Sequence, residues 1–408
     1  MPAVATDVLH NISRRITAAE HRHQPQHVQC TRFKSTTTKQ PSGMATTLLD
    51  TDTPIIPLAE AKRFIRDCME AVGTPRIHAE ALGDLLVEAD YRGHYSHGMN
   101  RLELYINDIK GGTCDSKAVP KILKETPATA WVDGQDGLGA VVGNFCMELA
   151  MKKAKEVGVG WVCAKQSNHY GIAGKYSLMA IEKNLIGMSF TNTSPFMTPT
   201  RGIKAALGTN PLALGAPGKD GDSFVLDMAT TAVAVGKIEI QRRKNAPIPE
   251  GWAQDDKGNV TTNADVAYNS AALMPVGGAE ITSGYKGYGL GLMVEILCGI
   301  LSGSKYGPNI RGWGTHSHDV ANLGQCFIAV NPECFAPGFD GRMSDLMDTI
   351  RNMEPADPEK PILIAGDPER IHMKAVDEAG GIKYLKNQMD TCATLSKTLN
   401  VDPMKACI

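Results

Sequence analysis

The sequence predicts a protein of mixed helix and strand, of class α/β or α+β, and three observations support this. Between residues 158 and 240, short apolar runs of strand length alternate with turns rich in Gly, Asn and Pro. Segments on both sides carry apolar residues every three or four positions, as amphipathic helices do. The chain has 408 residues and is 42% hydrophobic, which is enough for a substantial core in more than one domain-sized unit.

The same patterns place the elements in order along the chain. They predict helices over residues 59–72, 77–91, 144–157, 285–302, 341–353 and 381–399. They predict strands over residues 128–132, 158–164, 185–189, 212–216, 223–226 and 326–330. Gly137–Gly143 resembles a dinucleotide-binding glycine loop, but its spacing is G-x-G-x-x-x-G and no clear βαβ alternation with an acidic residue follows. We interpret it as a turn.

Composition excludes several classes of protein. Lys and Arg total 42 against 44 Asp and Glu, a formal charge of −2, so no global field attracts nucleic acid or an anionic membrane. The ten cysteines include no C-x-x-C pair, which favours reduced thiols over a zinc ribbon or a disulfide framework. The most apolar stretch, residues 290–302, is too short to span a bilayer. His316 and His318 precede Asp319 without further ligands nearby, so no metal is expected.

Residues 1–50 differ from the rest of the chain. Up to Leu49 they hold six basic side chains and two acidic ones, and apolar residues from Val8 to Ile16 recur at helical spacing. An Arg-rich amphipathic leader with few acidic residues is typical of a mitochondrial transit peptide. The alternative is a disordered extension of a cytoplasmic protein.

The segment ADYRGHYSHGMNR holds the first cluster of reactive side chains. His97, Arg101 and Tyr105 are spaced four residues apart, so a helix running through them would place all three on one face. An imidazole exchanges a proton near neutral pH, and a guanidinium binds a carboxylate through two parallel hydrogen bonds. Together they suit oxidation of a 2-hydroxy acid, whose hydroxyl proton leaves as C2 gives up a hydride. The alternative is a surface helix with scattered polar residues.

Further polar segments follow apolar runs or open a helix. His169 lies in a Gly-flanked loop after a strand, and Asn192–Pro195 and Gly208–Pro211 are dense in short hydrogen-bonding side chains. Asp227–Thr231 ends another strand. Gly284–Gly289 opens an apolar helix, whose first N–H groups are unpaired and suit a phosphate. Each of these segments also fits a simple turn, cap or packing role.

Taken together and in order, these segments resemble the malate/L-lactate dehydrogenase family of the second type, which includes ureidoglycolate, sulfolactate and diketogulonate oxidoreductases. The matching blocks are ADYRGHYSHGMNR, QSNHYGIAG, GTNPLALGAPG, VLDMATTAVAVGK, GWAQDDKGNVTTN and GYKGYGLGLMVEILCGILSG. The resemblance implies a non-Rossmann fold with a mixed, largely antiparallel sheet flanked by helices. It also implies a homodimer with the cofactor near the subunit interface.

The resemblance assigns roles to individual residues. Ser96 and His97 match the S-H-G motif, whose histidine is viewed as the proton donor or acceptor, and Asp227 is expected to help orient it. Arg101 matches a substrate-carboxylate position, with Tyr105 one turn further. His169 matches the S-N-H position and is a reserve base or a second substrate contact. The expected cofactor contacts are Thr193, Asp227, Met228, Ala229, Tyr285, Lys286, Gly287 and Gly366.

We therefore expect an oxidoreductase that uses NAD or NADP to transfer hydride to or from a small 2-hydroxy or 2-keto acid, with malate as the first choice. The alternatives are a reductase of cyclic imino acids or diketo sugar acids, a non-catalytic dinucleotide-binding relative and, more remotely, a metal-dependent hydrolase. The expected organisation is a leader over 1–50, a helical segment over 51–127 that packs with 331–408, and a central cofactor-binding domain over 128–330.

Overall fold

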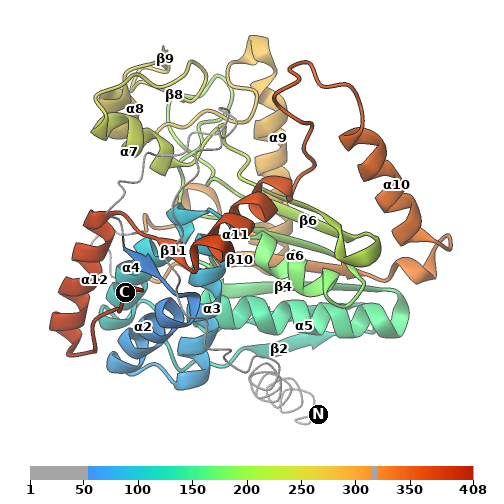
Figure 1. Ribbon diagram of the computed structural model, residues 1–408, viewed down its shortest axis with the longest axis horizontal. Coiled ribbons are helices and arrows are strands. Elements are labelled where there is room, and N and C mark those ends of the chain that lie inside the picture. The colour runs from blue at the N-terminus through green and yellow to red at the C-terminus, as the bar shows by residue number, and fades with distance from the viewer. Residues whose placement is uncertain (1–53, 314–318, 408) are drawn as a thin grey trace.

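One seven-stranded sheet organises the computed structural model, which describes residues 54–313 and 319–407 (Figure 1). In sheet order the strands are β2 (Lys121–Glu125), β3 (Thr129–Asp133), β4 (Val159–Ser167), β10 (Leu323–Val330), β5 (Ile186–Thr191), β6 (Leu212–Pro217) and β7 (Ser223–Met228). Neighbouring strands are antiparallel, except that β3 and β4 run parallel. This mixed, largely antiparallel sheet confirms the expected fold class.

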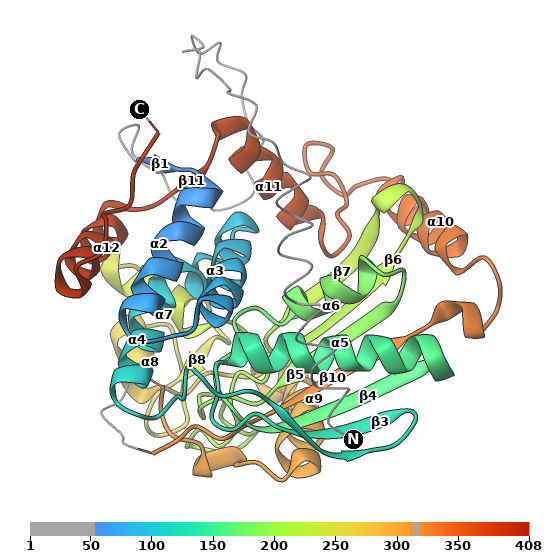
Figure 2. The same cartoon turned by 90° about the horizontal axis from the view of Figure 1, so that it is seen from below.

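The centre of the sheet is buried on both faces. β10 pairs with β4 on one side and β5 on the other, so that Cys326 lies opposite both Cys163 and Phe190. It is buried along its length up to Ala329, and a strand covered on both faces is apolar without alternation. The covering helices are α5 (Gly139–Val157) and α6 (Gly174–Ile181) on one face, and α9 (Gly284–Glu295) with its π-helical continuation Ile296–Ile300 on the other (Figure 2).

A second core joins the two ends of the described chain. Phe64, Leu82 and Ile106 from the N-terminal helices share it with Tyr384 and Leu395 from the C-terminal segment. The strand β1 (Ile55–Ile56) pairs antiparallel with β11 (Ile382–Lys383) at its edge. The helices around this core are α2 (Leu58–Ala71), α3 (Arg76–Tyr91), α4 (Leu102–Lys110), α11 (Asp367–Ala379) and α12 (Lys386–Leu399).

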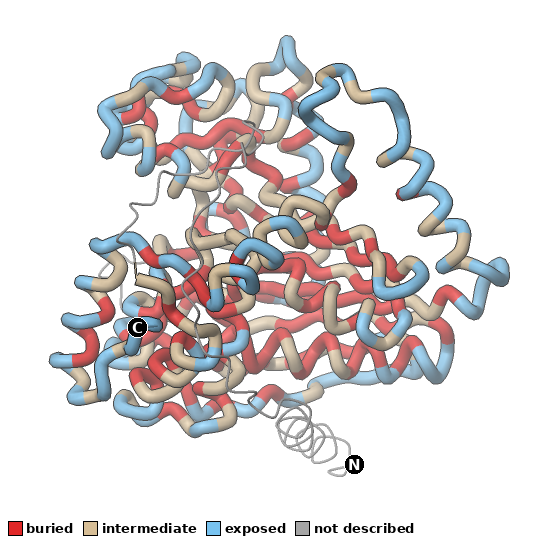
Figure 3. The backbone as a smooth tube through the Cα atoms, in the orientation of Figure 1, coloured by how far each residue is buried: buried red, intermediate tan, exposed pale blue. Residues whose placement is uncertain are grey.

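A small lobe lies opposite the N-terminal helices, at the upper left of Figure 1. Its apolar core includes Val233, Ile238, Ile248 and Leu273. Its elements are α7 (Val235–Arg243), β8 (Ala253–Gln254), β9 (Val260–Thr261) and α8 (Ala264–Ser270). The remaining helix, α10 (Phe339–Arg351), packs on β6 and β7, and Figure 3 shows it mostly exposed while the buried residues gather in the sheet and α5.

The structure differs from several sequence predictions. The helix expected through His97 and Arg101 is interrupted at Gly98, whose φ of −98° and ψ of −137° are not helical. Gly98 separates two short 3₁₀ turns, so α4 begins only at Leu102. The glycine segment interpreted as a turn contributes Gly139 and the next four residues to α5. The segment 381–399 begins with β11 and becomes helical at Lys386. The boundary expected at residue 128 divides the β2–β3 hairpin, because β2 belongs to the central sheet.

Other predictions concern the thiols, membrane spans and segments outside the described residues. The nine cysteines in the described part are free. In the same part, no helix is long and apolar enough to cross a bilayer. The leader interpretation for residues 1–50 and the interpretation of His316 and His318 lie outside the described residues.

Candidate active site

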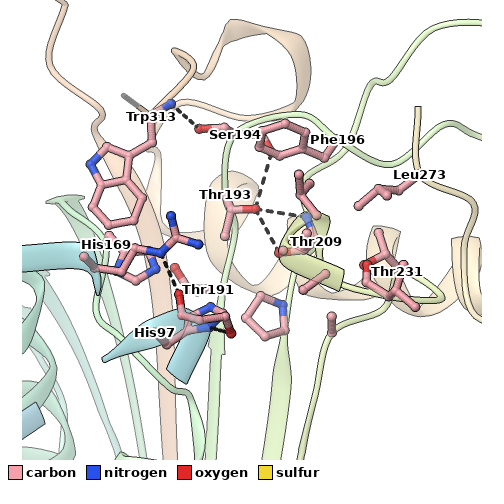
Figure 4. Close-up of a pocket in the computed structure, with 18 of the residues that line it drawn as sticks. His97, His169, Thr191, Thr193, Ser194, Phe196, Thr209, Thr231, Leu273 and Trp313 are labelled. Atoms are coloured by element: carbon pink, nitrogen blue, oxygen red, sulfur yellow. Dashed lines mark hydrogen bonds between the residues drawn. The ribbon is translucent and has the colours of Figure 1, made fainter. Parts of the chain in front are cut away.

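A cavity of about 770 Å³ lies where the α3–α4 connection, one edge of the central sheet and the small lobe meet. His97 and Arg101 line it from the α3–α4 connection, and His169 follows the end of β4. Thr193 follows the end of β5, and Thr209 precedes β6. Figure 4 shows the two histidines side by side, with the threonine turns on one flank. The antiparallel topology brings these distant segments to one place.

His97 is a neutral imidazole with one flexible partner. Its Nδ1 lies 2.8 Å from Ser96 Oγ, and a hydroxyl either donates or accepts. Burial, together with the charges of Arg101 and His94, lowers the pKa of His97 to about 4. When Nδ1–H donates to Ser96, Nε2 is free to accept a proton.

His169 is also neutral, but its contacts fix one tautomer. Its Nδ1 lies 2.6 Å from Tyr105 Oη and accepts a hydrogen bond from the Gly171 N–H at 3.3 Å. Because an N–H only donates, this Nδ1 carries no proton, and Nε2 carries it instead. Burial, with the nearby charges of His97 and Arg101, holds the pKa of His169 well below its usual value. His169 therefore presents a hydrogen-bond donor.

The loop that carries His169 rests on the glycine segment before α5. Asn168 Nδ2 donates to the carbonyl oxygens of Asp136 and Gly137 at 2.9 and 3.0 Å. A Cβ at Gly139 would overlap the carbonyl groups of Asn168 and His169. These glycines serve close packing beneath the His169 loop, and they do not line the cavity.

An aromatic stack extends from the two histidines. The His97 and His169 rings lie 5.6 Å apart with an interplanar angle of 24°, and Trp313 stacks on His169 at 4.1 Å and 21°. Tyr105 meets His169 edge-on at 5.8 Å. Sequence reasoning did not single out Trp313, because a lone aromatic residue in a polar, Gly-rich segment carries no motif.

Arg101 is a cation of this pocket whose terminal nitrogens are open to an anion. Its Nε donates to the Ser96 carbonyl oxygen at 2.6 Å, which fixes the side chain. The terminal nitrogens have no hydrogen-bond partner among the described residues. Burial lowers the pKa of Arg101, against the opposing charge of Glu239, but a guanidinium stays protonated. It is placed to bind a carboxylate.

Asp227 contributes to the pocket wall without touching the expected histidine. Its carboxylate accepts a hydrogen bond from Gly174 N–H at 2.7 Å, at the start of α6. Burial raises its pKa. Within the described chain it makes no hydrogen bond to Ser96 or His97. Met228 and Ala229, which follow it, line the cavity.

The remaining expected cofactor contacts lie elsewhere. Tyr285 and Lys286 are exposed in the first turn of α9, outside the cavity wall. Gly287 packs against the backbone of Val276, which does line the cavity. Gly366 is the residue before α11 and contacts Val225. In the single chain, none of these four positions therefore lines the cavity.

The donor set of the cavity fits a dinucleotide. α7 begins at Val235 without a side-chain cap, and Val235, Gly236 and Lys237 of its first turn line the pocket. The N-terminus of a helix favours an anionic group such as a phosphate. A Cβ at Gly236 would meet only Ser96 Cβ, at 3.7 Å, which leaves room for a ligand. The volume lies within the range of small-molecule and cofactor sites. Hydroxyl groups along the wall come from Thr191, Thr193, Thr209 and Thr231.

A proton-accepting histidine, a donating histidine and an open guanidinium beside a dinucleotide-sized cleft define a class of enzyme. The class is the nicotinamide-dependent 2-hydroxy acid dehydrogenases, here on a fold other than the Rossmann fold. Comparison with known proteins agrees, since the profile of the malate/L-lactate dehydrogenase family matches residues 56–392. The chain belongs to this family.

Relatives and solved structures give the same result. A malate dehydrogenase of Pyrococcus abyssi is 41% identical over 349 residues, covering 85% of this chain and 95% of that protein. An L-sulfolactate dehydrogenase of Methanocaldococcus jannaschii is 42% identical over 345 residues, covering 84% and 96%. The malate dehydrogenase structure from Pyrococcus horikoshii superposes with a TM-score of 0.80 at 37% identity, covering 87% of this chain and 98% of that chain.

Proposed function

We propose that this enzyme interconverts malate and the corresponding 2-keto acid with NAD or NADP. The observation that carries the proposal is the presence, in one buried pocket, of the open guanidinium of Arg101 beside the neutral imidazole of His97. The two relatives described above are named for malate and for L-sulfolactate. Both compounds are small 2-hydroxy acids with a second anionic group, which supports a diacid as the substrate.

Each pocket side chain has a distinct part in the proposed reaction. Arg101 binds the carboxylate at C1 and thereby fixes C2. His169 donates its Nε2–H to the C2 oxygen. In oxidation, His97 Nε2 takes the hydroxyl proton while the C2–H electron pair leaves as hydride. A nicotinamide cofactor held in the cleft would supply the acceptor for that hydride. In reduction, His97 returns the proton to the C2 oxygen.

A grid of substrates and cofactors tests this proposal. Malate, 3-sulfolactate, lactate, ureidoglycolate and a cyclic imino acid are each assayed with NAD(H) and NADP(H) by nicotinamide absorbance. We expect the highest kcat/KM with malate. A higher value with the imino acid would replace the hydroxy acid by an imine substrate. Dinucleotide binding without turnover of any compound would identify a non-catalytic relative.

The proposed assembly is a homodimer formed through the outer side of α9. Five large apolar side chains recur there at helical spacing and are 37–55% exposed: Leu290, Met293, Ile296, Ile300 and Leu301. We refer to them as the α9 apolar face. A contiguous apolar surface of this kind is typical of a protein interface. A second copy on this face would also cover Tyr285, which is 51% exposed one turn earlier.

The proposed location is the mitochondrion, on the composition of residues 1–50 alone. The archaeal and bacterial relatives give it no support. A fusion of the full chain to a fluorescent protein tests it in eukaryotic cells, with Arg14 and Arg15 replaced by Glu as the control. Diffuse cytoplasmic fluorescence of the unmodified fusion would contradict the proposal.

A further inference from the structure

Trp313 is fixed at the pocket wall by three contacts from three different parts of the chain. Its indole Nε1 donates to Asp108 Oδ2 at 2.9 Å, and its backbone N–H donates to Ser194 Oγ at 3.1 Å. Its ring stacks on the imidazole of His169 at 4.1 Å. Figure 4 shows the indole above His169, on the side away from His97. The indole is therefore the outer cover of the histidine pair.

The partner of Trp313, Asp108 on α4, is itself held firmly. Its Oδ1 accepts from the guanidinium of Arg311 at 2.9 Å, and the Arg311 side chain is only 4% exposed. Thr113 Oγ1 lies 3.1 Å from the same Oδ1. Ser194 Oγ in turn donates to the Arg311 carbonyl oxygen at 2.7 Å. Because Arg311 balances the charge of Asp108, the carboxylate is a rigid anchor for the indole.

We propose that Trp313 is a positioning residue of the active site, whose indole, tethered by Asp108, keeps water from the outer face of His169 and holds that ring with Nε2–H toward the substrate. The proposal rests on the function proposed above, in which His169 donates to the C2 oxygen. Tyr105 and Gly171 hold the Nδ1 edge of the same ring. The indole adds the restraint that they lack, because two contacts to one edge leave the ring free to tilt about that edge.

Two effects of the indole on His169 oppose each other. Its π face attracts a cation and would favour the imidazolium form, whereas its bulk excludes water and favours the neutral form. Burial is the largest cause of the low His169 pKa, and the indole stacked on the ring at 4.1 Å contributes to that burial. We therefore expect the exclusion of water to dominate. The other groups facing this ring are His97 and Arg101, which also lower its pKa, the Tyr105 hydroxyl and, behind the indole, the Asp108–Arg311 pair.

Loss of the indole therefore has a specific consequence. Water reaches His169, and its pKa rises toward the usual value of 6.5. A protonated His169 carries a hydrogen on Nδ1 as well, which conflicts with the Gly171 N–H that points at the same atom. The ring must then turn, and Nε2–H no longer points toward the C2 oxygen of the substrate. Activity would fall most at low pH.

The test compares Trp313→Ala and Trp313→Phe with Trp131→Phe in the full-length chain. Trp131 is a matched control because its Nε1 also donates a hydrogen bond, to the Ser302 carbonyl at 2.7 Å, but it lies on β3 away from the cavity. The readouts are the pH profile of kcat/KM and the titration of His169 by NMR of labelled imidazole, assigned with His169→Gln. The NMR readout needs no activity, so failure of the proposed function is recognised separately in the wild-type assay.

We expect Trp313→Ala to lower kcat by about tenfold or more with a smaller change in KM. Its His169 pKa and the acid limb of its profile should both move up by about one pH unit or more. Trp313→Phe should shift both in the same direction by less, and Trp131→Phe should shift neither. If Trp313→Ala does not fold, Trp313→Phe and Asp108→Asn carry the test. An unmoved His169 pKa in folded variants, or a loss of kcat equal at all pH values, would overturn the proposal.

Discussion

The two pocket histidines differ in what their ring nitrogens can do, although both are buried and neutral. His97 contacts a hydroxyl, which accommodates either tautomer, so its outer nitrogen can change protonation state during turnover. His169 receives a backbone N–H at Nδ1, which accommodates one tautomer only. The division between proton acceptor and hydrogen-bond donor thus follows from the partner on the far side of each ring.

Glutamine substitution separates these two roles, because an amide donates a hydrogen bond but does not accept a proton. We expect His97→Gln to lower kcat by about 10²–10⁴-fold with little change in KM. His169→Gln should retain more activity than His169→Ala, since the amide replaces the lost donor. Steady-state kinetics in both directions measure this. Near-normal kcat in His97→Gln together with loss in His169→Gln would exchange the two assignments.

Arg101 affects both substrate binding and the titration of its neighbour. We expect Arg101→Gln to raise KM by about 10–100-fold, because a charge-assisted contact worth about 1.5–3 kcal/mol is lost. Arg101 also lowers the pKa of His97, which is about 4. Removing that repulsion favours the imidazolium, so the pKa rises and the acid limb of kcat/KM moves to higher pH. Arg66→Gln on α2 should leave the limb unchanged, and an unmoved limb in Arg101→Gln would contradict this coupling.

At the residue scale, the sequence revealed groups with recognisable chemistry but not groups that act through shape. His97, Arg101 and His169 stand in motifs, and the structure brings them to one pocket. Tyr105, which contacts Nδ1 of His169, is 64 residues away along the chain. Trp313 depends on Asp108, at a separation of 205 residues. A local sequence pattern does not predict contacts between residues so far apart along the chain.

At the element scale, close backbone packing determines where the His169 loop lies. α5 starts with Gly139 directly against the carbonyl groups of Asn168 and His169. We expect Gly139→Ala to cost about 1–3 kcal/mol of unfolding free energy, because the added methyl forces the loop to move. kcat should fall by about tenfold or more as His169 is displaced. Urea unfolding and steady-state kinetics measure the two effects.

Gly83→Ala on α3 is the matched control for that substitution. Its Cβ would meet the Lys62 carbonyl oxygen at 3.4 Å, an ordinary contact. We expect unchanged kcat and a stability change of about +0.5–1 kcal/mol, the usual gain of Ala over Gly in a helix. If Gly139→Ala and Gly83→Ala change kcat and stability to the same extent, close packing at Gly139 does not position the His169 loop.

Elements with a strong period were predictable, and those shaped by tertiary contacts were not. The apolar repeat of residues 59–72 corresponds to α2, and the run at 212–216 corresponds to β6. α7 was missed because its sequence, VGKIEIQRR, alternates like a strand and buries only Ile238. Packing against the small lobe overrides that local pattern. The helix expected through Arg101 fails at Gly98, where the chain bends around the carboxylate of Asp90.

At the scale of the whole molecule, helices cover both faces of the sheet, but the helices on the two faces differ in the side chains they direct to solvent. α5 directs its apolar side chains into the core that it shares with α6 and the sheet. α9 and its π-helical continuation bury Val294 and Cys298 against β10 and β5, yet keep the α9 apolar face outward. The C-terminal helices do not reach it (Figure 2). A single chain therefore leaves this surface exposed.

A charge introduced into the α9 apolar face should separate the proposed dimer. Ile296 is 55% exposed, and an aspartate there would be desolvated without a partner in a dimer but hydrated in a monomer. We expect Ile296→Asp to halve the mass measured by light scattering, while circular dichroism stays unchanged. Leu346→Asp on α10 is the control, because Leu346 is 54% exposed on a different surface and should leave the mass as it is. A monomeric wild type, or a variant that keeps the dimer mass, would show that another surface or no surface joins the subunits.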